Sequence, residues 1–303
     1  MVFRLTGNDC EVLRMVIECR VVTTPQLAAL LSGNGKSLNR RIGQLVDQGY
    51  LADATRGRGQ RRGRPERVVS PAIGAVQVLQ ERGLIDPQVR AEEILGERVP
   101  PQAHHLLLNW VRAHLHHVGT VLPQLKIRFL AHNSPFLPAE YSSIAIAANP
   151  MPDATGPQKS ISFTPDAVFS ISDATQDKTV LFFLEVDRGT ETLGSPKRTP
   201  KDIRQKILNY GMCFDTLAYK KYESLWNCQL NGFRLLFVTD TVARLSTLST
   251  LVQEMPPSDF IWLTEQARMF KEGISAPIWV RGGRLDAPPH SIFGRWSCQA
   301  PLP

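Results

Sequence analysis

The chain has 303 residues and a formal net charge of +7 at pH 7. At this length two domains are expected rather than one compact core. Hydrophobic residues make up 43% and charged residues 21%, which excludes a wholly disordered chain. No apolar run reaches the roughly 20 residues that span a bilayer, and residues 1–9 lack a secretory signal pattern. We therefore expect a cytoplasmic protein without membrane partners.

Positive charge is concentrated in one short segment of the chain. Between residues 36 and 67 there are nine Lys or Arg and three acidic residues, which leaves six excess positive charges. The five cysteines are scattered and lack the close pairs of a zinc site or a redox motif. The local charge indicates an acidic partner for the N-terminal third.

Three short helices are predicted in that N-terminal third, over residues 8–19, 24–31 and 36–48. Asn8 is the predicted start of the first, Thr24 caps the second, and Gly49 ends the third. A tight turn before the third helix is typical of helix-turn-helix geometry. Its outward donors suit phosphates and base edges in a major groove: Ser37, Asn39, Arg40, Arg41 and Gln44. An ordinary solvated helix face is the alternative.

A basic loop follows between two predicted strands, residues 50–52 and 67–69. Its arginines lie among glycines, and one more begins the second strand: Arg56, Arg58, Arg61, Arg62, Arg64 and Arg67. So many like charges cannot be buried and repel one another without a polyanion, which indicates contact with double-stranded DNA. Residues 62–65 resemble the core of an AT-hook, which lies in a narrow minor groove. A solvated or disordered basic loop is the alternative.

The expected fold class is α+β with two domains. A winged helix-turn-helix is expected over residues 1–75, linker helices over 76–122, an α/β domain over 123–285 and an irregular tail over 286–303. Alternating patterns in the α/β domain predict a mixed sheet with flanking helices. The predicted strands are residues 126–131, 161–171, 179–187, 233–239, 260–263 and 278–280, and helices begin near residues 202 and 242.

Three acidic residues lie at the ends of neighbouring predicted strands. Glu185 and Asp187 close the strand 179–187 and point the same way, because side chains alternate along a strand. Asp166 reaches them if the two strands pair as a hairpin. Three converging carboxylates repel unless a divalent cation neutralises them, so Mg²⁺ or Mn²⁺ is the expected cofactor if the site is active, with phosphodiester hydrolysis as its chemistry, and no cofactor is expected if it is not. Acidic, solvent-facing strand ends are the alternative.

The acids carry a resemblance to known families. Pro165-Asp166 followed by Glu185-Val186-Asp187 resembles the PD-(D/E)xK nuclease superfamily, which implies a restriction-endonuclease-like fold. Together with residues 184–191 and 206–210, the pattern more specifically resembles the replication-relaxation family of plasmids and mobile elements. That family also carries an N-terminal winged helix, so the resemblance covers roughly residues 8–244.

One departure from the nuclease pattern concerns its lysine. Asp187 stands where the lysine is expected, which removes the group that orients the attacking water. Lys206 and Tyr210, one helical turn apart, are the expected substitutes beside the acids. Their spacing is similar to the Gln-x-x-x-Tyr element of RecB-like nucleases. Either the lysine has migrated, or the site binds DNA without cutting it.

Three functions are consistent with these patterns. The first is a DNA-binding regulator of plasmid or mobile-element replication or transfer, in which the nuclease-like domain is a platform. The second is a metal-dependent endonuclease that uses Asp166, Glu185, Asp187, Lys206 and Tyr210. The third is an interaction module for RNA or an acidic protein. A second copy of the chain and replication or mobilisation proteins are further candidate partners.

Overall fold

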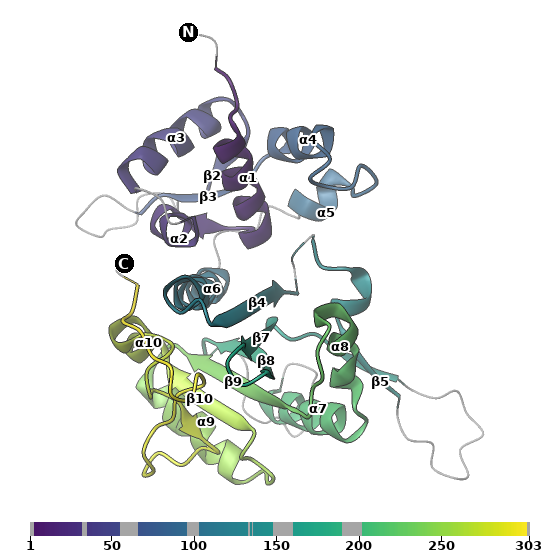
Figure 1. Cartoon of the computed structure of the whole chain (residues 1–303), viewed down its shortest axis with the longest axis vertical. Helices are drawn as coiled ribbons and strands as arrows, with labels where there is room; N and C mark the ends of the chain where they lie inside the picture. The colour runs from purple at the N-terminus through teal and green to yellow at the C-terminus, as the bar shows by residue number, and fades with distance from the viewer. Residues whose placement is uncertain are drawn as a thin grey trace. The chain divides into compact units, whose positions relative to one another are not determined.

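The computed structural model describes residues 3–31, 35–54, 66–95, 103–132, 134, 136–147, 160–189 and 202–301. The described residues form an α+β structure that divides into two compact units (Figure 1). Unit 1 is Met1–His117 with Asn133–Phe136 and Pro301–Pro303, and unit 2 is Val118–His132 with Leu137–Ala300. None of the helices in the described ranges is long and apolar enough to cross a membrane.

The three predicted N-terminal helices are present as α1 (Gly7–Cys19), α2 (Thr24–Leu30) and α3 (Gly35–Asp47). Their caps differ from the prediction. Helix α1 begins after Thr6 rather than at Asn8, because the Thr6 hydroxyl accepts from the Asp9 amide while the Asp9 carboxylate accepts from the Thr6 amide. Helix α2 is capped by Thr23, whose partner is Gln26, instead of Thr24.

A small antiparallel sheet follows the helices in unit 1. Its described strands are β1 (Val22–Thr23), β2 (Leu51–Asp53) and β3 (Val68–Pro71), in the order β1-β3-β2. Gly49 has a φ of 74° and follows α3, where the left-handed conformation favours glycine. The predicted strand pair on either side of the basic loop is confirmed, with shifts of one or two residues at its ends.

The segment predicted as linker helices contributes to the core of unit 1. It forms α4 (Ile73–Glu81), α5 (Ala91–Leu95) and α6 (Ala103–Val121). Val76, Leu79 and Ile94 are buried in the same core as the apolar face of α1. The Asn109 amide of α6 also donates to the backbone oxygens of Cys19 and Val21, at the end of α1. These helices therefore extend the N-terminal fold instead of standing outside it.

Unit 2 is built on a sheet that has six strands among the described residues. They are β4 (Leu125–Ala131), β7 (Ala167–Asp173), β8 (Lys178–Asp187), β9 (Phe233–Thr239), β10 (Ile261–Glu265) and β11 (Val280–Arg281). Their order is β11-β10-β9-β8-β7-β4. Strands β8, β9 and β10 are parallel, whereas β4, β7 and β11 pair antiparallel with their neighbours. The carboxyl ends of the parallel strands therefore meet at one edge.

The strand predicted over residues 161–171 is two strands. Residues Ser160–Phe163 form β6, which pairs with β5 (Ile144–Ala147) in a separate hairpin, and β7 begins only at Ala167. Pro165 lies between them. Proline has no amide hydrogen and cannot continue the hydrogen-bond ladder, so the chain changes sheets at this residue.

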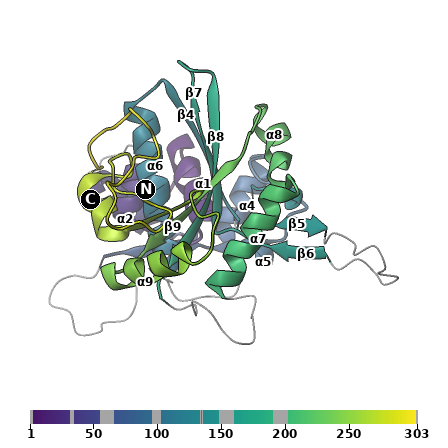
Figure 2. The ribbon, with the colours of Figure 1, turned by 90° about the horizontal axis from the view of Figure 1, so that it is seen from below.

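One face of the large sheet is covered by α7 (Ile203–Asp215) and α9 (Val242–Gln253) (Figure 2). Phe183, Phe237 and Leu263 of the sheet share a buried core with Ile207 and Leu248 of these helices. Helix α8 (Lys221–Trp226) also contributes to this core, and α10 (Gln266–Glu272) follows β10. The core fixes α7 and α9 near the carboxyl ends of β8 and β9.

The segment predicted as an irregular tail packs against unit 2. Residues 291–301 form no helix or strand. Ile292 and Phe293 are nevertheless buried, His290 forms a backbone bridge with Trp279, and the Trp296 indole donates to Asp173 at 2.8 Å. The tail is thus part of the packed structure.

Candidate functional site

Asp166 lies beside the end of β8, as the predicted hairpin requires. Strands β7 and β8 pair antiparallel with Ala167 opposite Leu184, which confirms the hairpin. The Asp166 carboxylate accepts a hydrogen bond from the Val186 amide at 2.8 Å. Its backbone oxygen accepts from the amide of His132, just beyond β4. The start of β7 is therefore held to both neighbouring strands.

Glu185 is bound by two residues of α7. The Tyr210 hydroxyl donates to Oε1 at 2.6 Å, and the Lys206 ammonium donates to Oε2 at 3.0 Å. Lys206 and Tyr210 are four residues apart and share one helix face. The Glu185 side chain is only 3% exposed, so both carboxylate oxygens are satisfied within the protein. The structure thus brings together the three residues that the sequence places at this site.

The surroundings of Glu185 change its acidity. Burial raises its pKa to about 7, and the nearby charge of Asp166 acts in the same direction. Lys206 and the Tyr210 hydroxyl act in the opposite direction but do not outweigh burial. Burial and the Glu185 charge also raise the pKa of Tyr210 well above its ordinary value. Glu185 is therefore a buried carboxyl group that exchanges its proton near neutral pH.

Asp187 has a different partner from Glu185. Arg244 donates to both of its carboxylate oxygens, through Nε at 2.6 Å and Nη2 at 3.1 Å, and the Gly189 amide donates at 2.9 Å. Arg244 lies in the first turn of α9, whose N-cap is Thr241. Sequence reasoning missed Arg244, because it is 57 residues from Asp187 and no spacing rule joins them. The sequence did contain one signal: Arg244 is at the start of the predicted helix that follows the strand 233–239, and such helix starts lie near the carboxyl ends of parallel strands.

The oxygens of Glu185 and Asp187 are already bonded by groups of the protein. Within the described ranges no group of three or more His, Cys, Asp or Glu side chains is placed to hold a metal ion. Both oxygens of Glu185 are bound by α7, and both oxygens of Asp187 are bound by Arg244. The positive charge that the carboxylates need comes from Lys206 and Arg244. A Mg²⁺ or Mn²⁺ ion at the three carboxylates would therefore have to displace Lys206 or Arg244 from these oxygens.

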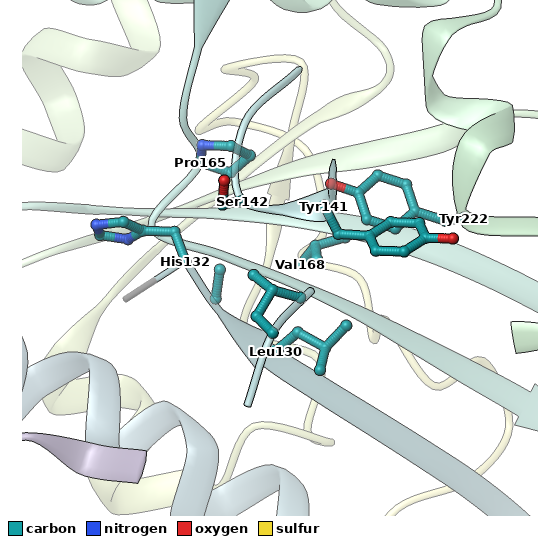
Figure 3. Close-up of a pocket in the computed structure, with 9 residues that line it drawn as sticks. Leu130, His132, Tyr141, Ser142, Pro165, Val168 and Tyr222 are labelled. Atoms are coloured by element: carbon teal, nitrogen blue, oxygen red, sulfur yellow. The ribbon is translucent and has the colours of Figure 1, made fainter. Parts of the chain in front are cut away.

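A small cavity lies next to Asp166. His132, Pro165 and Val168 line it together with Tyr141 and Tyr222, and Figure 3 shows the two tyrosine rings side by side. Its volume of about 10 Å³ is close to the room that one water molecule needs. The buried Tyr222 hydroxyl has no hydrogen-bond partner among the described residues. The cavity fits a buried water but is too small for a substrate.

The second candidate surface is α3 in unit 1. Ser37, Asn39, Arg40 and Gln44 are exposed on this helix, and Ile42 and Leu45 are buried beneath it. The outward position that the sequence predicts is therefore observed for four of the five residues. Their donors face away from the core of unit 1.

Arg41, the fifth predicted contact, is bound within unit 1. Its Nε and Nη2 donate to the two carboxylate oxygens of Asp9, both at 2.6 Å, and its guanidinium lies 4.4 Å from the centre of the Phe3 ring. Burial raises the pKa of Asp9, but hydrogen bonds from Arg41 and Thr6 outweigh it, so the pKa lies below its ordinary value. Arg41 therefore ties α3 to the start of α1.

The arginines of the basic loop are mostly outside the described residues. These are Arg56, Arg58, Arg61, Arg62 and Arg64, all predicted to bind DNA. Arg67 is described, and its Nε lies 3.6 Å from Asp53 Oδ2. The Arg67 side chain is 33% exposed. It forms an ion pair between β2 and the start of β3.

Comparison with known proteins gives one assignment. No curated protein and no solved structure matches the chain. The family described as Replication-relaxation matches residues 13–223. This range contains α3, the three acids, Lys206 and Tyr210. Because the match spans more than half of the 303 residues, the chain belongs to the replication-relaxation family.

Proposed function

We propose that this protein binds duplex DNA through unit 1 and acts in the replication or relaxation of a plasmid or mobile element, or in its regulation. Membership of the replication-relaxation family supports a role in replication or relaxation. The surface of α3 supports the contact with DNA. In this proposal unit 2 is a platform for DNA or for partner proteins of replication or mobilisation.

The observation that carries the proposal is the exposed row of donors on α3. The order α1, β1, α2, α3, β2, β3 resembles a winged helix, in which the helix after the turn enters the major groove. Arg40 suits the acceptors of guanine, and Asn39 and Gln44 suit adenine. Arg41 supports this helix from behind through Asp9, so the exposed row is held on a fixed backbone.

The charge of the same region supports the proposal. Residues 36–67 carry six excess positive charges, and most of the arginines fall between β2 and β3, where a wing would be. Cations near the phosphates supply much of the affinity of a protein for DNA and make it depend on salt. We therefore assign phosphate or minor-groove contacts to the loop and base contacts to α3.

A matched pair of variants tests the role of α3. The full-length protein is titrated into a labelled duplex and binding is followed by fluorescence anisotropy. Arg40→Ala should weaken binding by roughly 5-fold to 150-fold, the cost of one good base contact. Arg82→Ala removes the same charge from an exposed position after α4 and should leave affinity unchanged. The proposal is contradicted if both variants lower the affinity equally, or if Arg40→Ala leaves the affinity unchanged.

A competition experiment separates DNA from other acidic partners. Unlabelled duplex DNA, RNA of the same sequence and an acidic polypeptide are added to the labelled complex. Duplex DNA should displace the label at the lowest concentration. More effective displacement by RNA or by the polypeptide would favour the interaction module instead.

A second candidate function is a metal-dependent endonuclease. One observation favours it: the Lys206 ammonium donates to Glu185 at 3.0 Å, so a lysine lies beside the acids although Asp187 stands at the position of the lysine in the nuclease pattern. Supercoiled plasmid is incubated with the protein and Mg²⁺ or Mn²⁺. Nicking that is lost in Asp166→Ala, Glu185→Gln and Lys206→Met, but retained in Arg204→Met on the exposed side of α7, would support an enzyme. Absence of nicking would support the regulator.

A further inference from the structure

A second pocket lies in unit 2, far from the acid cluster. It is near Lys178 at the start of β8, roughly 30 Å along the strand from Asp187 at the rise of an extended chain. Residues 291–296 of the tail form one wall, and β4, β7, β8, β9 and the β7–β8 turn contribute the rest. The pocket has a volume of about 190 Å³. An engineered cavity of roughly 150 Å³ holds benzene, so a small ligand or part of a larger one fits here.

Arg234 is the unusual residue of this pocket. It lies on β9, between β8 and β10, and its guanidinium carbon is 4.3 Å from the centre of the Trp262 ring. No described residue accepts a hydrogen bond from it or forms an ion pair with it. Burial lowers its pKa, and the charge of Arg281 does the same. Desolvation of an arginine that has no acid costs free energy, and an anion bound at Arg234 would offset this cost.

Two further cations line the pocket, Lys178 and Arg295, and both are exposed. Asp173 is the acid among its lining residues. Hydrogen bonds from Thr175 and Trp296 lower the pKa of Asp173 to about 2, and Gln176 donates to it as well. Its oxygens accept from neutral donors of the β7–β8 turn and the tail, and the charge of Arg295 also lowers its pKa. Three cations, Lys178, Arg234 and Arg295, against the one acid Asp173 leave the lining with excess positive charge.

Apart from Gln176, Ser291 and Gly294, the rest of the lining is apolar or aromatic. Val180, Ile292 and Phe293 line the pocket together with the Trp296 side chain. A cationic centre with an apolar wall suits a ligand that joins an anionic group to a flat, weakly polar ring. Arginine is the side chain that best matches the oxygens of a phosphate.

We propose that this pocket binds the phosphate group of a nucleotide, with Arg234 as its partly buried ligand, Lys178 and Arg295 at its mouth, and the sugar or base against Trp296. The phosphate can belong to a free mononucleotide or to the end of a single DNA strand. This site is in unit 2 and uses none of the donors of α3. Its test is therefore independent of duplex binding by unit 1.

Calorimetric titration of the full-length protein with a set of probes tests the ligand class. The probes are inorganic phosphate, thymidine, thymidine monophosphate, and a short thymidine oligonucleotide with or without a 5′ phosphate. Thymidine monophosphate should bind at least tenfold more tightly than thymidine. If the 5′-phosphorylated oligonucleotide binds more tightly than the unphosphorylated one, the bound phosphate belongs to a strand end. If the two oligonucleotides bind with equal affinity, the ligand is the free nucleotide. Equal binding of thymidine and its monophosphate, or no binding of any probe, overturns the proposal.

Variants test the assignment of residues. Arg234→Gln should weaken binding of thymidine monophosphate at least tenfold, and Arg295→Gln several-fold. Lys271→Gln, exposed on α10 and outside the pocket, is the control and should bind as the wild type does. Thermal unfolding of each variant shows whether it is folded. If Arg234→Gln does not fold, the surface double variant Lys178→Gln/Arg295→Gln decides, and wild-type affinity in that variant overturns the proposal.

Discussion

Arg244 binds both carboxylate oxygens of Asp187, through Nε at 2.6 Å and Nη2 at 3.1 Å. Asp187 stands where the nuclease pattern has a lysine, so this edge of the sheet has an additional acid. Helix α9 supplies the cation for Asp187, and α7 supplies Lys206 for Glu185. Two helices thus neutralise two acids at the end of one strand.

Removal of Arg244 should strongly destabilise unit 2. Asp187 is buried, so Arg244→Met leaves a carboxylate without a cation, and we expect the free energy of unfolding to fall by about 3 to 5 kcal/mol. Asp187→Asn should cost less, because the Arg244 side chain is 14% exposed and can turn to water. Urea unfolding measures both, with Arg268→Met on the surface of α10 as a control. A loss below about 1 kcal/mol for Arg244→Met would contradict the assignment.

Stability should depend on pH through Glu185. Its pKa in the folded protein is about 7, above its ordinary value of 4.5, so the folded state holds a proton that the unfolded state releases. The stabilisation is complete below pH 4.5 and is lost as the pH rises toward 7. Its magnitude is on the order of 3 kcal/mol.

The comparison of wild type with Glu185→Gln isolates this group. The amide can still donate to the Tyr210 oxygen and accept from Lys206, and it does not titrate in this range. Urea unfolding at a series of pH values should show the wild type losing stability relative to the variant between pH 4.5 and 7. A difference that is constant or rises with pH would exclude the raised pKa.

Tyr210→Phe should lower stability and raise the pKa of Glu185 further. The phenylalanine keeps the ring contacts with Phe163 and Phe183 but removes the hydroxyl that donates to Glu185 at 2.6 Å. A buried oxygen left without its donor costs about 1 to 3 kcal/mol. The pH window of the previous experiment should move upward in this variant. An unchanged window would show that the hydroxyl does not stabilise the ionised carboxylate.

Arg40 and Arg41 are adjacent but should respond differently to substitution. Arg41→Met breaks the ion pair with the buried Asp9 and should lower the free energy of unfolding of unit 1 by about 1 to 3 kcal/mol. Arg40→Met removes an exposed charge and should change it by less than about 0.5 kcal/mol. Chemical unfolding of both variants measures the contrast. Equal losses would show that Arg41 has no special role in holding α3 to α1.

Local periodicity predicted the part of the acid site that depends on single elements. Lys206 and Tyr210 share a helix face because they are four residues apart, and the hairpin of β7 and β8 brings Asp166 to the end of β8. Arg244 could not be predicted in this way. Its contact with Asp187 depends on how β8, β9 and α9 pack, and that packing is not encoded in any short spacing.

The same limit applies to unit 1. The apolar faces of α4 and α5 resemble those of any short helix, so the sequence did not reveal that Val76 and Ile94 belong to the N-terminal core. The helical spacing of α3 predicts that Arg41 points outward. Its ion pair with Asp9 depends on how α1 packs against α3, which the spacing does not show. The split of the predicted strand at Pro165 was readable in principle, since proline interrupts a ladder.

The salt dependence of duplex affinity tests the central claim most directly. Anisotropy is measured over a range of salt concentrations for the wild type, for Asn39→Ala/Arg40→Ala/Gln44→Ala on α3, and for Arg62→Ala/Arg64→Ala in the loop. We predict that the α3 variant loses at least tenfold in affinity. The loop variant should also bind more weakly, and its log-log slope should fall by roughly one for each lost phosphate contact. Wild-type affinity and slope in both variants would contradict DNA binding by unit 1.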